Sequence, residues 1–291
     1  LEMRTIMKTG IVFEGGAFRT IFSCGVMDAL VENDIMPDYM IGVSAGAAYG
    51  VSMASKQPRR NLDVLMKYRN DKRYLGLSNM IDKDNKSIYG LEFSYETIPN
   101  ELNLFDYDAF KQYKGDFYCV VTNLLTGQPE YMKYTGDDRT NTVLKATCAL
   151  PMLFPPIIIN DVPYMDGGLS DSIPYLKAIE DGCDRIIVVL TRQSGYTKTT
   201  SRSTKAIAYS YRNQYPKLTE TMLTRASRYN ESLKGLDQYV KEGRIITIQP
   251  TTSKGFSRLE KDKNKILSMY NDGYNQCYEL LDTIKEFYGI K

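Results

Sequence analysis

A serine stands between two glycines in the segment Gly42-Val43-Ser44-Ala45-Gly46, which has the form G-x-S-x-G. In this pattern a tight turn between a strand and a helix lifts the serine oxygen off a sheet, and the start of the helix supplies free N–H groups. The segment therefore predicts a nucleophilic serine, Ser44, with the amide of Ala45 beside it. For this segment alone, a glycine-rich turn whose serine only caps the helix is the alternative.

A second group of small residues, Gly15-Gly16-Ala17, follows the first apolar segment of the chain. Such residues leave backbone N–H groups uncovered next to a helix start, which suits the binding of an oxyanion. The spacing matches neither G-x-G-x-x-G nor G-x-x-x-x-G-K-[ST], so a nucleotide-binding loop is not indicated. An ordinary tight turn between strand and helix remains the alternative.

A third motif, Asp166-Gly167-Gly168, places a carboxylate on a glycine turn. A carboxylate held on a glycine turn can approach another backbone closely. Taken alone, an Asp-Gly pair more often closes a hairpin.

The chain contains no histidine, which limits the chemistry of these motifs. A Ser-His-Asp triad and a histidine-ligated zinc site are excluded, so a general base must be another side chain. Acid-base chemistry near neutral pH is then left to Asp, Glu, Lys, Tyr or Cys. The S-x-x-K signature of a Ser-Lys dyad is absent from the chain.

Alternating strand and helix patterns position the motifs. Apolar segments at residues 10–13 and 39–43 predict strands, and residues 18–32 and 45–54 predict the helices after them. Further strands are expected at 117–122, 130–134, 157–159, 162–165 and 185–190, and helices at 60–68, 140–149 and 174–179. Such alternation predicts a parallel α/β sheet. Residues 75–104 show no clear periodicity and are expected to be irregular, as in a lid.

The character of the chain changes after residue 190. We expect a catalytic core over residues 8–190, followed by a mostly helical extension over residues 191–291 that packs on the same domain. The extension has helical patterns at 217–242 and 259–288 and one strand at 245–248. Residues 185–217 carry seven Lys or Arg and no acidic residue. Contact with anionic headgroups is one interpretation, and a solvated surface loop is the favoured one.

Composition excludes several classes of protein. The 291 residues have a formal net charge of +2, which gives no reason to expect nucleic acid binding. Five cysteines without a C-x-x-C pair argue against a disulfide framework and a metal site, and suit a cytoplasmic protein. No segment resembles a signal peptide or a membrane span, and Leu1-Glu2 is expected to be a cloning remnant.

In their order along the chain, the three motifs resemble those of the patatin-like phospholipase family. That family has an oxyanion motif D-G-G-G-x-R-G, a G-x-S-x-G elbow and a D-G-[GA] with the catalytic aspartate. Here the first motif reads E-G-G-A-F-R-T over residues 14–20, and the run at 146–156 is similar to the family's segment before the aspartate. The resemblance covers roughly residues 10–190. Beyond it, the chain is more loosely similar to the C-terminal region of bacterial patatin-like proteins.

The resemblance implies a three-layer α/β sandwich with a mainly parallel central sheet and a helical C-terminal region. It also implies a Ser-Asp dyad, with Ser44 as nucleophile and Asp166 as general base, and no cofactor or metal. Asp161 and Asp171 are the nearby substitutes for Asp166. The oxyanion hole would consist of the N–H groups of Gly15, Gly16, Ala17 and Ala45. Supporting positions would be Arg19, which fixes the loop, and Gly42, Gly46, Gly167 and Gly168.

The first motif departs from the family pattern at three positions. Glu14 replaces Asp, Ala17 replaces the third Gly and Thr20 replaces the last Gly. The function implied is hydrolysis of phospholipid or other acyl esters, with transient contact to a membrane surface. Two alternatives are a patatin-fold protein that binds lipid or a partner without turnover, and an acyltransferase or thioesterase that uses the same dyad. The oligomeric state is not indicated.

Overall fold

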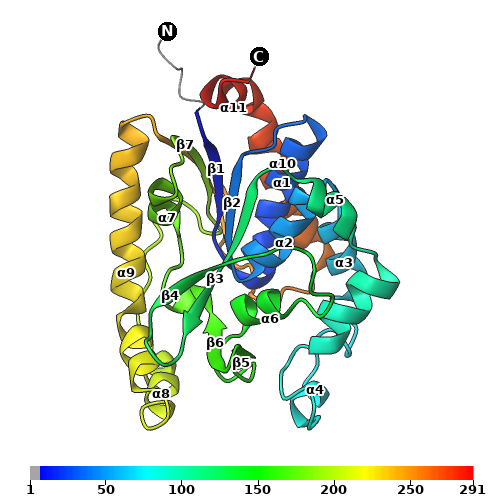
Figure 1. The fold of residues 1–291 in the computed structure, drawn as a ribbon, viewed down its shortest axis with the longest axis vertical. Coiled ribbons are helices and arrows are strands. Elements are labelled where there is room, and N and C mark those ends of the chain that lie inside the picture. The colour runs from blue at the N-terminus through cyan, green and yellow to red at the C-terminus, as the bar shows by residue number, and fades with distance from the viewer. Residues whose placement is uncertain (1–6, 291) are drawn as a thin grey trace.

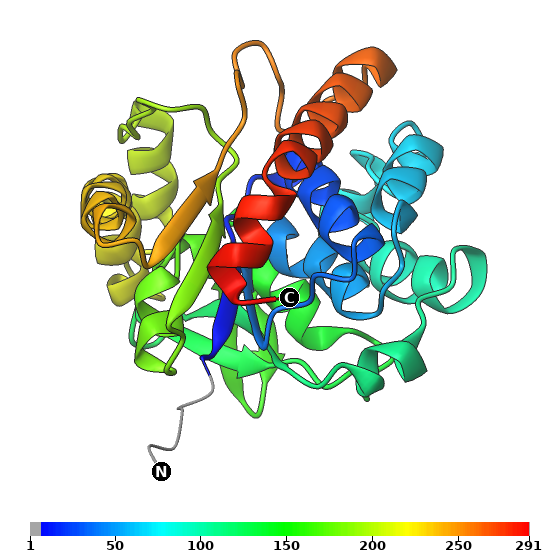
Figure 2. The ribbon, with the colours of Figure 1, turned by 90° about the horizontal axis from the view of Figure 1, so that it is seen from above.

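The computed structural model describes residues 7–290, so the expected remnant Leu1-Glu2 lies outside the described part. One sheet lies at the centre, with helices on both faces (Figures 1 and 2). Hydrogen-bonded neighbours follow one another in the order β5 (Ile157–Ile159), β6 (Val162–Asp166), β3 (Asp116–Asn123), β2 (Tyr39–Val43), β1 (Thr9–Phe13), β7 (Arg185–Val189) and β8 (Ile245–Ile248). In addition, β4 (Pro129–Lys133) pairs with β3.

The middle of the sheet is parallel, as the alternation of strands and helices predicts. Strands β3, β2, β1, β7 and β8 run in one direction, whereas β4, β6 and β5 are antiparallel to their neighbours. Every residue of β1 and β2 is buried. Parallel strands covered on both faces need such continuous apolar sequences, so the prediction of a mainly parallel sheet is confirmed.

Two helical layers cover the sheet, and alternate residues of β1 face them. Ile11 and Phe13 pack in one hydrophobic core, and Val12 packs in the other. The first core lies under α1 (Ile21–Glu32), α2 (Ala45–Ala54), α3 (Arg60–Tyr68), α5 (Tyr107–Gln112) and α10 (Lys263–Glu279). The second lies under α7 (Tyr175–Glu180) and the long α9 (Pro216–Lys241), on the opposite side in Figure 2. The expected three-layer sandwich is therefore confirmed.

The C-terminal region contributes to both layers and to the sheet. Strand β8 pairs with β7, and α10 lies against α1. Glycine at position 273 permits this close contact, since a Cβ there would lie 2.0 Å from the carbonyl oxygen of Phe22. The single helix expected over 259–288 is instead two, α10 and α11 (Leu281–Tyr288), because the backbone of Leu280 departs from helical geometry. The spacing of apolar residues continues across this break, so the sequence pattern does not reveal it. The division at residue 190 stays a prediction.

The expectation of an irregular segment over residues 75–104 is wrong in part. The segment contains a short helix, α4 (Ser78–Ile81), and η2 (Phe93–Leu102), which is wound as a π-helix. A helix bonded from residue i to i+5 does not repeat every 3.6 residues, so a search for α-helical periodicity misses it. Whether the segment acts as a lid stays a prediction.

Two α-helices and two 3-10 helices, η1 (Ala17–Thr20) and η3 (Gly167–Leu169), complete the described chain. Helix α6 (Thr142–Cys148) precedes the β5–β6 hairpin, and α8 (Arg202–Ser210) lies at the foot of α9 (Figure 1). Within residues 7–290, no helix is long and apolar enough to cross a membrane.

Candidate active site

The register of β3 brings Ser44 and Asp166 together. Residues of β3 up to Val120 pair with β2, so that Val43, just before the serine, lies opposite Val120. Strand β2 then ends, and β6 enters from the opposite direction along the same edge of β3, with Asp166 opposite Val121. The other edge is taken by β4, which pairs with β3 on both sides of this point. The ends of β2 and β6 therefore meet head to head, one with the serine and one with the aspartate.

Ser44 occupies a strained turn between β2 and α2. Its φ is 54° and its ψ is −129°, a conformation that costs a residue with a side chain roughly 1–3 kcal/mol. Thr147 holds the turn, since its Oγ1 accepts a hydrogen bond from the Ser44 amide at 2.9 Å. Gly46 lets α2 start close to β1, because a Cβ there would lie 2.5 Å from the carbonyl oxygen of Phe13. This is the strand–turn–helix geometry of a nucleophile elbow.

Asp166 is buried, with 2% of its surface exposed. Its Oδ1 accepts a hydrogen bond from the amide of Gly168 at 2.8 Å, whereas Oδ2 has no partner among the described residues. Burial raises the pKa of the Asp166 carboxyl, and the nearby Ser44 hydroxyl and Arg225 guanidinium act in the opposite direction. Ser44 thus lies close to the carboxylate without a hydrogen bond of good geometry to Oδ2. A raised pKa and a free lone pair are what a general base requires.

The loop with Gly15, Gly16 and Ala17 packs directly against the serine. A Cβ on Gly15 would lie 2.8 Å from the Cβ of Ser44. The amides of these three residues, and that of Ala45, make no hydrogen bond with any described group. Ala17 has a φ of 50°, so the residue in place of the third family glycine takes the left-handed conformation that glycine favours. All four residues predicted for the oxyanion hole thus line a pocket together with Ser44 and have N–H groups without a partner among the described residues.

Glu14 and the C-terminal region hold this loop in place. The Glu14 carboxylate accepts hydrogen bonds from the amide and the hydroxyl of Thr191, at 2.7 and 3.0 Å. The Phe18 amide donates to the carbonyl oxygen of Arg258 at 3.0 Å. Arg19 is buried, but its Nε has no partner among the described residues. The arginine expected to fix the loop is thus inside the protein, while the hydrogen bonds that fix the loop come from Glu14 and Arg258.

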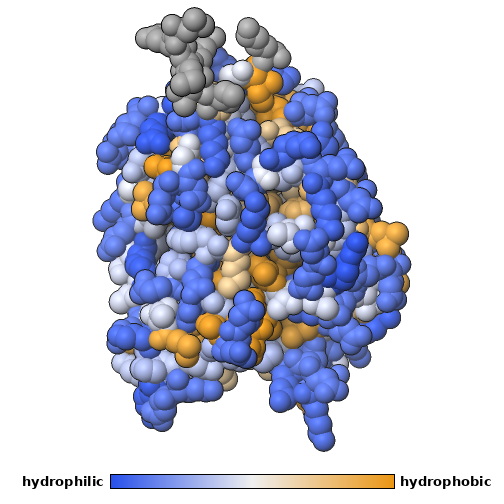
Figure 3. All heavy atoms as spheres, in the orientation of Figure 1, coloured by the Kyte–Doolittle hydropathy of each residue, from blue (hydrophilic) through white to orange (hydrophobic). Residues whose placement is uncertain are grey.

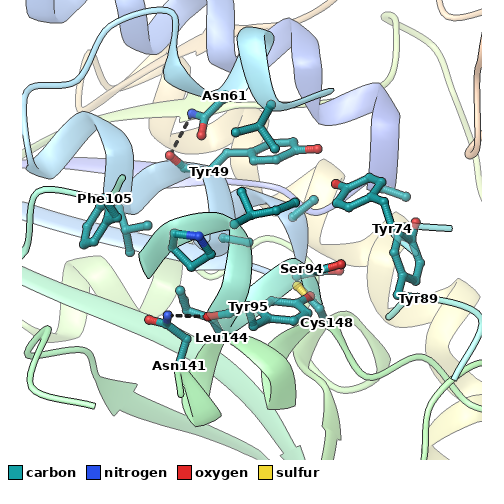
Figure 4. A pocket seen from close by; sticks show the side chains of 18 of the residues that line it. Tyr49, Asn61, Tyr74, Tyr89, Ser94, Tyr95, Phe105, Asn141, Leu144 and Cys148 are labelled. Atoms are coloured by element: carbon teal, nitrogen blue, oxygen red, sulfur yellow. Dashed lines mark hydrogen bonds between the residues drawn. The ribbon is translucent and has the colours of Figure 1, made fainter. Parts of the chain in front are cut away.

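One side of Ser44 opens into a cavity of about 130 Å³, here called the apolar pocket. Figure 4 shows tyrosine rings around it, with Asn141 bonded to the Tyr95 carbonyl at one edge and the Cys148 sulfur near Tyr95. The volume is close to the ~150 Å³ of an apolar cavity that accepts benzene. Apolar residues also gather in the middle of the face in Figure 3, amid a largely hydrophilic surface. The lining includes Ala17, Ala48, Tyr49, Val64, Tyr74, Tyr89, Tyr95, Ile98, Leu144, Cys148 and Phe154.

The other side of Ser44 opens into a smaller polar cavity of about 50 Å³, here called the cationic pocket. Ser44, Ala17 and Leu150 line both cavities, so the serine lies at their junction. The cationic pocket is at the carboxyl ends of β1 and β7, where the connections leave the sheet in opposite directions, the usual ligand site of an open α/β sheet. Its lining includes five basic residues: Arg19, Arg192, Lys198, Arg225 and Arg258.

Sequence analysis missed most of this basic cluster. The solvated loop expected for residues 185–217 is wrong for Arg192 and Lys198, which are half-buried in the cationic pocket. Arg225 and Arg258 lie in separate C-terminal segments that carry no motif. The lack of acidic residues around Lys198 is the one sequence feature that points to a cation without an ion-pair partner.

The two substitute bases lie elsewhere. Asp161 is exposed in the turn of the β5–β6 hairpin, with a φ of 64°. Asp171 accepts a hydrogen bond from the hydroxyl of Tyr131 at 2.9 Å. Neither lines a pocket with Ser44. Across residues 7–290, no group of three acidic or cysteine side chains is arranged to hold a metal ion.

Comparison with known families agrees with this geometry. The family model described as patatin-like phospholipase matches residues 11–179, more than half of the chain. The chain belongs to the patatin-like phospholipase family. A second model, described as a domain of unknown function (DUF6363), matches residues 215–289. At the level of the family, the assignment is to lipid acyl hydrolases.

Relatives of this patatin-like chain differ from it in length. It is 27% identical over 196 residues to the uncharacterized protein YjjU of Escherichia coli, covering 63% of this chain and 52% of YjjU. It is 29% identical over 193 residues to lysophospholipase nte1 of Aspergillus terreus, covering 62% of this chain and 12% of nte1. The chain thus spans about half the length of the first relative and much less of the second. VipD of Legionella pneumophila aligns with a TM-score of 0.48 at 16% identity, over 96% of this chain and 67% of VipD.

Proposed function

We propose that this protein is a serine acyl hydrolase that cleaves acyl esters of lipids, with Ser44 as nucleophile and Asp166 as general base. The observation that carries the proposal is the unpartnered Oδ2 of a buried aspartate next to a serine in a strained elbow. Buried polar atoms are almost always satisfied, so an orphan carboxylate oxygen at this position suggests a role in proton transfer.

In the acylation step, the acyl chain occupies the apolar pocket and the ester carbonyl lies at the junction of the two pockets. The Oγ of Ser44 attacks the carbonyl carbon while its proton passes to Oδ2 of Asp166. The amides of Gly16, Ala17 and Ala45 donate hydrogen bonds to the developing oxyanion. The carbon–oxygen bond to the alcohol then breaks, and the proton on Asp166 passes to the leaving alkoxide.

Deacylation repeats these steps with water. Asp166 removes a proton from the water as its oxygen attacks the acyl carbon, the bond to Ser44 Oγ breaks, and the proton returns to Oγ. The acid is released and the enzyme is restored. Burial of Asp166 serves both steps, because a carboxylate with a raised pKa is a stronger base than one in water.

Labelling with a fluorophosphonate probe tests the proposal directly. The wild-type protein is expected to be labelled at Ser44 and to hydrolyse a short acyl ester, and Ser44→Ala to do neither. A matched control is Ser227→Ala, because Ser227 is an exposed serine on α9 that lines neither pocket and donates to the Thr224 carbonyl. Absence of labelling in a folded wild-type protein would favour a lipid-binding protein instead. Transfer of the acyl group to an added alcohol or thiol would identify an acyltransferase.

A further inference from the structure

The cationic pocket holds more positive charge than acyl transfer at Ser44 uses. Its basic residues are Arg19, Arg192, Lys198, Arg225 and Arg258. Its acidic residues are only Glu14 and Asp166, and the first is engaged by Thr191. Within residues 7–290, none of the five cations lies within 4 Å of a carboxylate oxygen. Arg258 is exposed, but Arg19 is buried and the other three are half-buried. Charges removed from water in this way are normally paired, so the cluster lacks an anion.

We propose that the cationic pocket binds a compact anionic group of the substrate, a phosphate monoester or a carboxylate, on the alcohol side of the ester. The inference rests on the proposed function of Ser44, since it assigns the head of the same substrate. The acyl chain would extend to one side of the serine and the anion to the other.

Contacts within the protein hold Arg225 and Lys198 in position. The Nε of Arg225 donates to the Gly168 carbonyl, which holds the guanidinium beside the aspartate turn. The Lys198 backbone is bonded on both sides to the Asn230 amide, at 2.8 and 2.9 Å, and its Nζ lies 3.8 Å from the centre of the Tyr229 ring. These contacts orient the cations without neutralising them. Preorganised donors lose less freedom on binding than mobile surface lysines do.

The electrostatics show the cost of leaving the pocket without an anion. Burial lowers the pKa of Lys198 to about 7, and the charge of Arg225 adds to the effect. Burial also lowers the pKa of Arg19 to about 10, with further contributions from Arg192 and Arg258. A bound anion reverses both trends because it stabilises the protonated form of each neighbour. Charge-assisted hydrogen bonds to phosphate or carboxylate then use donors that are free in this structure.

The size of the pocket restricts the anion. A single water molecule needs about 10–15 Å³ of such space, so a pocket of about 50 Å³ has room for only a few water-sized groups. A phosphate or carboxylate fits such a space, whereas a phosphate carrying a choline group needs more room. Because Ser44 lines both pockets, the anion must be only a few bonds from the ester oxygen.

Calorimetric titration of Ser44→Ala with inorganic phosphate tests the pocket independently of hydrolysis. Saturable binding is expected, and Lys198→Met in the same background should weaken it roughly tenfold or more, the usual effect of losing one charge-assisted hydrogen bond. The matched control is Lys205→Met, because Lys205 is an exposed lysine on α8 from the same basic stretch, outside the pocket. No saturable phosphate binding, or an equal loss in both variants, would overturn the proposal.

A series of hexanoyl esters then tests the substrate class with the wild-type enzyme. The esters are monoacylglycerol phosphate, monoacylglycerophosphocholine, neutral monoacylglycerol and O-acyl lactate. At least one compact acidic ester should exceed the neutral ester in kcat/KM by about tenfold or more, and Lys198→Met should bring that ratio close to one. A preference for the phosphate ester or for the lactate ester identifies the anion.

Two outcomes separate this proposal from the proposed function. Equal hydrolysis of neutral and acidic esters, or best hydrolysis of the phosphocholine ester, would refute the anion subsite and leave Ser44 as a nucleophile. Phosphate binding that Lys198→Met weakens, together with no hydrolysis of any ester, would uphold the anion pocket and refute the hydrolase.

Discussion

Replacement of Asp166 by asparagine separates the role of this residue in catalysis from its role in folding. The side-chain oxygen of asparagine can keep the hydrogen bond that Oδ1 accepts from the Gly168 amide. The new NH₂ group takes the place of Oδ2, which has no partner to lose. It can donate to Ser44 Oγ but cannot accept its proton. The geometry is therefore kept while the base is removed.

The expected magnitude follows from what a general base contributes. Loss of a positioned base lowers rates by roughly 10²–10⁴-fold, or about 2.7–5.5 kcal/mol of transition-state stabilisation. The folded-state pKa of Asp166 is raised, so its ionised form destabilises the fold as pH rises through that pKa. A neutral asparagine removes this cost. Asp166→Asn should thus be at least as stable as the wild type at pH 8 while nearly inactive.

Two measurements check this prediction, kcat/KM on a hexanoyl ester and the free energy of unfolding in urea. In the wild type, the acidic limb of kcat/KM should lie above the ordinary carboxyl pKa of about 4. The control is Asp171→Asn, because Asp171 is another carboxyl whose pKa is raised by burial, bonded to Tyr131 rather than near Ser44. If Asp166→Asn keeps more than a tenth of the activity, or if both variants lose it equally, the dyad is wrong.

Three further predictions concern stability and the apolar pocket. Asp28 has a pKa raised to about 6 by burial, so the wild type should lose up to roughly 3 kcal/mol of unfolding free energy between pH 4 and pH 7. Asp28→Asn should remove this loss because asparagine does not ionise. Its single oxygen can keep both hydrogen bonds that Oδ2 accepts, from the Arg59 amide and the Tyr270 hydroxyl. Urea titrations at the two pH values measure the loss in each protein. Ala17→Gly should change the free energy of unfolding by no more than about 1 kcal/mol. Ala17→Val should lower it by more, because a β-branched residue resists a φ of 50°. An equal effect of the two substitutions would show that the backbone of Ala17 is not strained. Because the apolar pocket has a volume of only about 130 Å³, hexanoyl esters should exceed palmitoyl esters in kcat/KM. Ala48 lines this pocket, so Ala48→Phe should reduce hexanoyl turnover more than acetyl turnover. Turnover that does not depend on chain length would place the acyl chain elsewhere.

Much of the fold follows from local patterns. Buried apolar strands such as β1 and β2, each followed by a glycine turn and a helix, specify a parallel α/β sheet without reference to the rest of the chain. The antiparallel entry of β6 along the edge that β2 vacates is different. It depends on the pairing of β3 with both β2 and β6, segments dozens of residues apart in the chain, for which one sequence contains no register signal.

The candidate site divides in the same way. Motifs around Ser44 and Asp166 are visible because tight turns demand particular residues at fixed spacing. The cationic pocket has no such signature, since Lys198, Arg225 and Arg258 come from three segments that only tertiary packing brings together. Each alone looks like an ordinary surface charge. The π-helical η2 is hidden for another reason, because its repeat differs from that of an α-helix.

The head-to-head meeting of β2 and β6 separates the position of Ser44 and Asp166 from the sequence of the surrounding connections. Ser44 and Asp166 are both positioned by backbone ladders within one sheet, and the surrounding connections line the two pockets. Insertions or exchanges in residues 75–104 or 191–216 can change the shape of the pockets while the spacing of Ser44 and Asp166 stays constant. The scaffold therefore allows selectivity and reactivity to vary as independent properties.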